Sequence, residues 1–177
     1  MARQDIAASL QRAESIFSRR PEAPIHDDAP GIVRCQGGLR FEATHENGTR
    51  VLTDMPAELG GTGDQVSPGW LARAGLAACT ASCIALAAAT EGIELDTLEV
   101  KATSRSNARG MLVIATADGE TVYPGPHDVQ MHVRISARGV APQRLRTLVE
   151  ESNRRAPVTA AFKTALEVSL YIEIEGA

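Results

Sequence analysis

The chain has 177 residues, with 18 Lys and Arg against 22 Asp and Glu, so its net charge is −4. This length is typical of a single domain that buries its own core. The acidic balance argues against nucleic acid as the main partner, because phosphate binding needs a basic surface, and one Trp, two Tyr and three Phe are too few to form a stacking platform for bases.

The first segment predicts a helix over residues 3–20. Its apolar side chains recur at steps of four, three and four residues, which places them on one helical face; they are Ile6, Leu10, Ala13 and Phe17. Prolines at positions 21, 24 and 30 end this helix. We therefore expect residues 1–30 to form an N-terminal helix and a proline-rich linker, and residues 31–177 to form the main domain.

The N-terminal segment and the most apolar stretch of the chain both bear on the protein's cellular location. It lacks the continuous apolar run of about 7–15 residues that a secretory signal needs. The most apolar stretch, residues 71–89, is interrupted by Arg73, Gly75, Thr80 and Ser82, so we expect neither a membrane span nor a membrane partner. These features predict a cytoplasmic protein, in which three cysteines do not describe a disulfide framework.

Residues 31–53 carry the pattern of antiparallel strands. Residues 31–35 form a short apolar run, and residues 39–44 alternate apolar and polar side chains as a half-buried strand does. Asn47-Gly48 is a strong hairpin signal, after which residues 50–53 return. The next segment, residues 55–63, is predicted to be a glycine-rich loop.

Ser67 and Pro68 mark the start of the longest helix, since Ser is a favoured N-cap and Pro is favoured at the first helical position. The helix is expected to run from Gly69 to about Glu91, with Gly92 at its C-terminal cap. It is rich in alanine and apolar on nearly all sides. Such a helix is buried in a core or in an interface.

The second half of the chain mixes strands and helices. Alternation predicts strands over residues 98–102 and 129–135, with a turn between two strands at 107–110. Pro142 and Pro157 open two further helices, and residues 168–174 alternate as a final strand. The resulting order, βββ-α-βββ-αα-β after a leading helix, indicates an α+β fold with one long helix packed on antiparallel sheet.

The long helix contains two of the three cysteines. Cys79 and Cys83 lie four residues apart and therefore share one face. They are interpreted either as small core residues, since free cysteine is often buried, or as a site in which one thiol reacts. No metal or other cofactor is expected: His127 and His132 are five apart on a predicted strand, so they point to opposite faces.

Three features around the long helix occur together. They are Pro-Ala-Glu-Leu-Gly-Gly at 56–61, the helix start at Ser67-Pro68, and Leu-Ala-Ala-Cys-Thr at 76–80, with eleven positions from Pro68 to Cys79. This combination resembles the OsmC/Ohr family of osmotically inducible and organic hydroperoxide resistance proteins. A weaker match lies at residues 155–158, where the family often has Cys-Pro. The expected order of elements agrees with the family from Gly31 to the C-terminus.

The resemblance implies an OsmC-like homodimer with intertwined sheets and two long central helices at the interface. It also implies a thiol peroxidase site, in which Cys79 matches the cysteine that attacks the peroxide. The family's activating arginine comes from the first hairpin. Arg40 is the best match for it, with Arg34 and Arg50 as alternatives.

Two parts of the implied site are missing from this chain. Ala156 stands where the family has its second cysteine, and Gly69 stands where it has a glutamate. The chain therefore resembles a divergent member with a degenerate site. Cys83 and Cys35 are alternative partners for Cys79, although a disulfide between positions four apart strains a helix. An external thiol reductant is the further alternative.

Other residues near this site are weaker candidates. Glu58, in the predicted loop, is a candidate substitute for the missing glutamate, although an exposed loop carboxylate is the simpler interpretation. Trp70 is a candidate binding residue at the start of the long helix. Arg154 and Arg155 would add positive charge near Cys79 if the resemblance holds, and otherwise form a solvated helix end.

Two functions are weighed on these grounds. The first is a thiol-dependent reduction of organic hydroperoxides through a single reactive cysteine, Cys79. The second is a non-catalytic role, in which a pocket at the dimer interface holds a small apolar molecule and Cys79 only lines it. A regulatory variant of the same fold would sense peroxide by oxidation of Cys79 without turnover.

Overall fold

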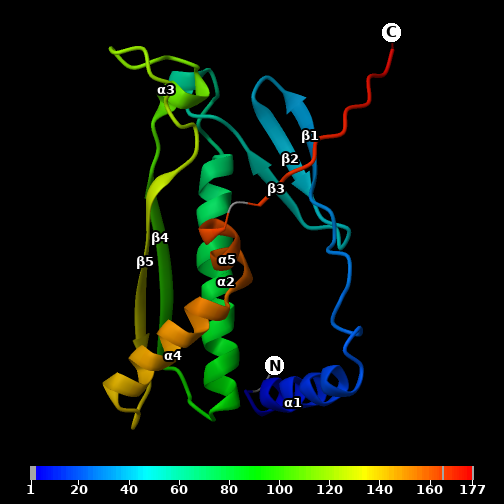
Figure 1. Cartoon of the computed structure of the whole chain (residues 1–177), viewed down its shortest axis with the longest axis vertical. Helices are drawn as coiled ribbons and strands as arrows, with labels where there is room; N and C mark the ends of the chain where they lie inside the picture. The colour runs from blue at the N-terminus through cyan, green and yellow to red at the C-terminus, as the bar shows by residue number, and fades with distance from the viewer. Residues whose placement is uncertain (1–2, 165, 177) are drawn as a thin grey trace.

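The structure is a computed structural model that describes residues 3–164 and 166–176. Its elements follow the order α1 (Arg3–Arg19), β1 (Ile32–Gly37), β2 (Arg40–Thr44), β3 (Arg50–Thr53), the 3-10 helix η1 (Ala57–Leu59), α2 (Pro68–Thr90), β4 (Thr97–Arg105), α3 (Ala108–Met111), β5 (His127–Ser136), α4 (Pro142–Arg155) and α5 (Pro157–Lys163). The fold is mixed α+β with antiparallel sheets, as predicted (Figure 1).

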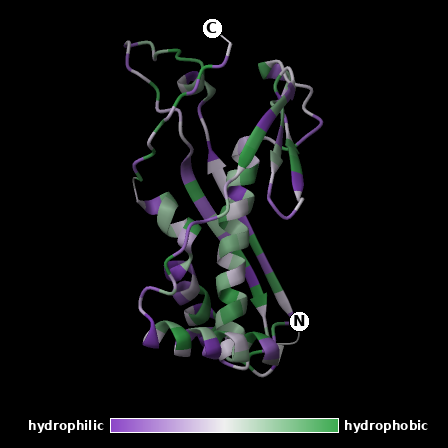
Figure 2. Cartoon of the chain, turned by 90° about the vertical axis from the view of Figure 1, so that its right-hand side faces the viewer, coloured by the Kyte–Doolittle hydropathy of each residue, from purple (hydrophilic) through white to green (hydrophobic). Residues whose placement is uncertain are grey.

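Helix α2 lies at the centre of the chain and contacts α1, β4, α4 and α5. Its start is confirmed: the side chain of Ser67 accepts a hydrogen bond from the Trp70 N–H at 3.2 Å, and Pro68 is the first helical residue. Figure 2 shows that α2 is coloured mainly white to green, which matches its apolar composition. By length and composition alone α2 would suffice to cross a membrane, but it makes the contacts of a core helix.

The core lies between α2, α4 and the second sheet. Ile84 and Ala88 of α2 pack against Leu148 of α4, and all three are at most 2% exposed. Partly buried side chains from β4 and β5, including Val100 and Val133, surround them. The core is thus formed by the apolar faces of α2, of α4 and of the β4–β5 sheet, which pack against one another.

Two antiparallel sheets are formed. The first has the order β1-β2-β3, with Phe41 opposite Thr53. The second pairs β4 with β5 and places Val100 opposite Val133. Figure 1 shows the first sheet beside the upper end of α2, and the second sheet along the opposite side of the helix.

The glycine-rich segment before α2 is a tight turn around η1. Gly60 has a φ of 87°, which favours glycine. A Cβ on Gly61 would lie 1.8 Å from the carbonyl oxygen of Met55, so no side chain fits there. The Gly-Gly pair is therefore explained by backbone geometry in this loop.

Three details of the predicted order are wrong. Residues 107–110 begin the short helix α3, capped by the side chain of Asn107, rather than forming a simple turn. The strand expected between this turn and residues 129–135 is absent among the described residues, since 112–126 have no regular structure. Described residues from 166 to 176 also form no strand, since they pair with neither of the two sheets.

Candidate functional site

Cys79 lies where α2 meets the start of α5. The backbone N–H of Val158 donates a hydrogen bond to Sγ of Cys79 at 3.4 Å. The next residue of α2, Thr80, is fully buried, and its Oγ1 lies 3.1 Å from Oγ1 of Thr159 in a second contact between the two helices. The half-buried thiol of Cys79 therefore has a defined place and an N–H group directed at its sulfur.

Cys83 lies one turn further along α2, on the same face. Burial raises the pKa of the Cys83 thiol, and the neighbouring Cys79 raises it further, whereas Arg155 acts in the opposite direction. Cys83 and Arg155 also line a hollow of about 780 Å³ between α1 and α2. A raised pKa reduces the thiolate fraction of Cys83 at neutral pH, which does not favour it as a nucleophile.

Cys35 is exposed on β1, in the first sheet. Its sulfur accepts a hydrogen bond from the N–H of Gly37 at 3.4 Å, at the irregular end of the β1–β2 pairing. The contacts of its sulfur are thus made within its own hairpin. Within a single chain, the structure does not bring Cys35 together with Cys79.

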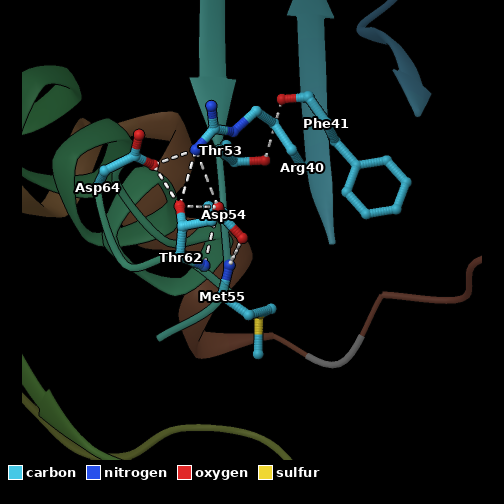
Figure 3. A network of polar contacts seen from close by, with 7 residues as sticks. All are labelled: Arg40, Phe41, Thr53, Asp54, Met55, Thr62 and Asp64. Atoms are coloured by element: carbon cyan, nitrogen blue, oxygen red, sulfur yellow. Dashed lines mark hydrogen bonds and ion pairs between the residues drawn. The ribbon is translucent and has the colours of Figure 1, made fainter. Parts of the chain in front are cut away.

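Arg40, the predicted activating arginine, belongs to a different network (Figure 3). Its guanidinium forms ion pairs with Asp54 and Asp64, and it donates to the hydroxyl of Thr62 at 2.7 Å. Asp54 is only 3% exposed and also accepts the N–H groups of Met55 at 2.7 Å and Thr62 at 3.2 Å.

This network has a clear electrostatic consequence. Hydrogen bonds from Thr62, from the Met55 N–H and from Arg40 lower the pKa of Asp54, although burial acts in the opposite direction. The two carboxylates in turn raise the pKa of Arg40. In this conformation Arg40 closes the loop over residues 54–64, and its guanidinium is engaged there rather than with a thiol.

Glu58 and Trp70 lie on the two elements that flank the segment leading into α2: Glu58 is on η1, and Trp70 is in the first turn of α2. Glu58 is exposed on η1. Trp70 is 47% exposed in the first turn of α2 and lines a small hollow together with Ala77 and Val100. Neither residue contributes to the contacts described around Cys79.

A pocket of about 600 Å³ opens at the N-terminal end of α2. Its lining comes from the loop that the Arg40 network closes, from the first turns of α2, from the ends of β4 and β5, and from α3 and α5. Most lining side chains are apolar; they include Met55, Leu59, Met111, Val129 and Phe162. Arg73 is the charged side chain among the described residues that line it.

The pocket and Cys79 are connected along one face of α2. Ala72 lines the pocket and lies seven residues, or about two helical turns, before Cys79. Helix α5 also reaches both places, with Val158 at Cys79 and Phe162 at the pocket. An apolar molecule in the pocket would thus lie about 10 Å along the helix axis from the thiol.

Arg73 and Arg155 have surroundings in the structure that their local sequence does not reveal. Arg73 had been noted only as an interruption of an apolar stretch, although a single charge on such a helix is itself a signal. Arg155 appears beside Cys83 because α4 packs against α2, which no local pattern reveals. Among residues 3–164 and 166–176, no group of three or more His, Cys, Asp or Glu is placed to hold a metal.

Comparison with known proteins agrees with this architecture. The family model described as OsmC-like protein matches residues 61–171. The organic hydroperoxide resistance protein OsmC of Legionella pneumophila has a similar structure, with 22% identity and a TM-score of 0.56 over 78% of this chain and 92% of that chain. None of the curated proteins matches the chain in sequence.

Two further solved structures give the same result. The OsmC-like protein of Mycoplasma pneumoniae is 16% identical, with a TM-score of 0.63 over 78% of this chain and 89% of that chain. The organic hydroperoxide resistance protein OhrB of Bacillus subtilis is 21% identical, with a TM-score of 0.50 over 77% and 91%. At such low identity these similarities establish a shared fold.

Proposed function

The chain belongs to the OsmC-like protein family, and from this premise we propose that it reduces organic hydroperoxides with Cys79 as the attacking thiol. One observation carries the proposal: Cys79 is the half-buried cysteine whose sulfur accepts a backbone N–H at the junction of α2 and α5. The two other cysteines are less suitable. Cys83 has a raised pKa, and Cys35 lies on the separate first sheet.

The reaction proceeds in two balanced steps. The thiolate of Cys79 attacks one oxygen of the hydroperoxide, the O–O bond breaks, and the products are a sulfenic acid and an alkoxide that takes up a proton to become an alcohol. An external thiol then condenses with the sulfenic acid and releases water, and a second thiol displaces Cys79 as a disulfide forms. Two thiols are oxidised for each hydroperoxide reduced.

The Val158 N–H has a role in both steps. In the first step it stabilises the thiolate before attack, and in the second it donates to the sulfur again as negative charge returns to it when Cys79 is displaced from the mixed disulfide. Arg155 adds a positive charge that acts to lower the pKa of the neighbouring Cys83. Arg40 could act as the activating arginine only if its guanidinium left its ion pairs with Asp54 and Asp64 and moved to Cys79. In this proposal its first role is therefore to hold the loop of residues 54–64 in place.

The proposed active form is a homodimer. The isolated chain exposes 13239 Å², whereas a compact monomer of its mass would expose about 8300 Å². Large apolar side chains remain exposed on the first sheet and on the C-terminal segment; they include Val33, Leu170 and Ile172. A second copy of the chain that covered these surfaces would complete the core. A cytoplasmic location would supply the reduced thiols that the second step needs.

The proposal is tested by intact-mass analysis after addition of one equivalent of cumene hydroperoxide and a sulfenic-acid trap. The wild type and Cys83→Ser are expected to gain one trapped adduct, whereas Cys79→Ser gains none. A loss of two hydrogens would instead identify a disulfide and replace the external thiol with Cys83 or Cys35. A wild-type protein that stays fully reduced, beside a family member that oxidises under the same conditions, would contradict peroxidase activity.

The binding function remains the second candidate, because the pocket beside α2 favours it. Its lining is largely apolar, and its volume of about 600 Å³ lies in the range of small-molecule sites. In that case Cys79 stays reduced while the pocket is occupied. The two functions are compatible, since a substrate must also be bound.

A further inference from the structure

Arg73 is a charged group that the proposed reaction does not use. It is the only charged residue in the 23 residues of α2. Its guanidinium Nη1 donates a hydrogen bond to Oγ of Ser104, on β4, at 3.3 Å. No other polar partner of Arg73 occurs in the part of the chain that the structure describes. Arg40, by contrast, is paired with two carboxylates.

The pocket surrounds this guanidinium with apolar groups and neutral polar groups. Its polar lining, apart from Arg73, consists of hydroxyls and one amide: Ser67, Ser104, Ser106 and Asn107. Neither Asp nor Glu is among the described residues that line it. A guanidinium has five N–H donors in a planar fork that fits a carboxylate. Most of these donors are unused here.

The space in front of Arg73 is open because residue 69 is glycine. A Cβ on Gly69 would lie 3.6 Å from Nη1 of Arg73 and 3.9 Å from Oγ of Ser67. A carboxylate side chain at this position would be four residues before Arg73 and would pair with it along the helix. Gly69 itself supplies no carboxylate, and none of the described residues that line the pocket is Asp or Glu, so the place is open to an external anion.

We infer that the pocket binds an organic acid with an apolar chain, whose carboxylate pairs with Arg73 while the chain lies against Met55, Leu59 and Phe162. The charge complements Arg73 and the chain complements the apolar lining. The inference rests on the proposed function in one respect: the bound acid would lie about 10 Å along the axis of α2 from Cys79. Binding itself requires no reaction at the thiol.

The test compares sodium decanoate with decan-1-ol by isothermal titration calorimetry on the full chain, below the micelle concentration of decanoate. The two probes have the same chain length and differ in charge. Arg73→Gln removes the cation, and Gly69→Glu supplies an internal carboxylate to it. Gly69→Glu should fold well, because glutamate is favoured over glycine in a first helical turn. Arg138→Gln, an exposed arginine paired with Asp96, is the control of equal charge change.

The wild type and Arg138→Gln are expected to bind decanoate more tightly than decan-1-ol. Arg73→Gln and Gly69→Glu should each weaken decanoate binding by about tenfold or more, as the loss of a charge-assisted hydrogen bond does, and leave decan-1-ol binding unchanged. Equal affinity for both probes in the wild type would overturn the inference. Unchanged decanoate affinity in Gly69→Glu would also overturn it, even if Arg73→Gln failed to fold.

The experiment separates this inference from the peroxidase proposal. Cys79→Ser should bind decanoate as the wild type does. Decanoate binding by a protein whose Cys79 resists peroxide would sustain the inference and contradict the proposed activity. Oxidation of Cys79 in a protein that does not bind decanoate would support the proposed activity and contradict the inference.

Discussion

Val158 and Cys79, 79 positions apart in the sequence, are joined by a hydrogen bond from a backbone N–H to a thiol sulfur. The bond places the turn between α4 and α5 beside the proposed nucleophile. Ala156, two residues before Val158, is the N-cap of α5 and is fully buried in this turn. Ala156, which the family resemblance matches to a second cysteine, thus lies two residues from the N–H that is bonded to the Cys79 sulfur.

This relationship predicts that Ala156→Cys installs a resolving thiol. After addition of one equivalent of cumene hydroperoxide, the variant is expected to lose the mass of two hydrogens and to form a disulfide with Cys79, because the new thiol would lie only two residues from the Val158 N–H that is bonded to the Cys79 sulfur. Peptide mapping identifies the pair. Ala160→Cys, one turn along α5 and exposed, is the matched control and should form no such bond. A sulfenic acid that persists in Ala156→Cys would contradict the predicted proximity.

Local patterns predicted much of the fold. Ser67 and Pro68 place the start of α2 correctly because capping is decided by a few neighbouring residues. The helices at residues 3–20, 142 and 157 and the strands at 40–44 and 50–53 follow from periodicity and turn residues in the same way. The α+β class and the resemblance to the OsmC-like family were confirmed on this basis.

Long-range features were less accessible to sequence reasoning. The alternation of residues 168–174 correctly describes a chain suited to a strand, but a strand also needs a neighbour to accept its hydrogen bonds. The partners of Arg40 lie 14 and 24 positions away, so its engagement with Asp54 and Asp64 could not be read from the hairpin. Whether Arg40, Glu58 and Trp70 act in the site stays a prediction.

Ser152 gives a prediction about stability. It is fully buried on α4, and its hydroxyl has no hydrogen-bond partner among the described residues. Because an unsatisfied buried polar group destabilises a fold, Ser152→Ala is expected to raise the free energy of unfolding by about 1 kcal/mol. Urea denaturation followed by circular dichroism measures this change.

Thr159→Val is the matched comparison for Ser152→Ala. It removes a hydroxyl of similar burial that does have a partner, Thr80, and leaves the Thr80 hydroxyl with only the weak acceptor Sδ of Met131 at 3.7 Å. The variant should therefore lose about 1–3 kcal/mol. If both variants change stability in the same direction and by the same amount, the distinction between a satisfied and an unsatisfied hydroxyl is wrong.

Asp54 predicts how stability depends on pH. Hydrogen bonds, first from the Thr62 hydroxyl and also from Arg40, lower the pKa of Asp54 below its ordinary value of 3.8, and the pKa of Asp64 is lowered in the same way. A carboxyl group with a lowered folded-state pKa contributes stability that is fully present above its unfolded pKa. That contribution is lost as the pH falls from about 4 through the lower folded pKa.

Asp54→Asn tests this dependence. The variant is expected to be less stable than the wild type at pH 7 and to lose less stability between about pH 4 and pH 2, because the protein then has one fewer carboxyl group with a lowered pKa to protonate in that range. Thermal unfolding at a series of pH values measures both effects. Asp118→Asn is the control, since Asp118 also has a lowered pKa but lies outside the Arg40 network. Parallel pH profiles for the wild type and Asp54→Asn would contradict the argument.

The C-terminal segment predicts the oligomeric state. Val168, Leu170, Ile172 and Ile174 occupy alternate positions, which would share one side of a strand, and each is at least 73% exposed. If a second copy covers this side, Ile172→Asp buries a charge in place of an apolar side chain and should weaken the dimer at least about tenfold. Ser169→Asp, at an alternate position on the other side, should leave it intact. Sedimentation equilibrium distinguishes the two, and a wild-type chain that sediments as a monomer would refute the dimer. If the Ile172→Asp dimer dissociates and the Ser169→Asp dimer does not, the alternating residues 168–174 form a strand that is paired only when two chains associate.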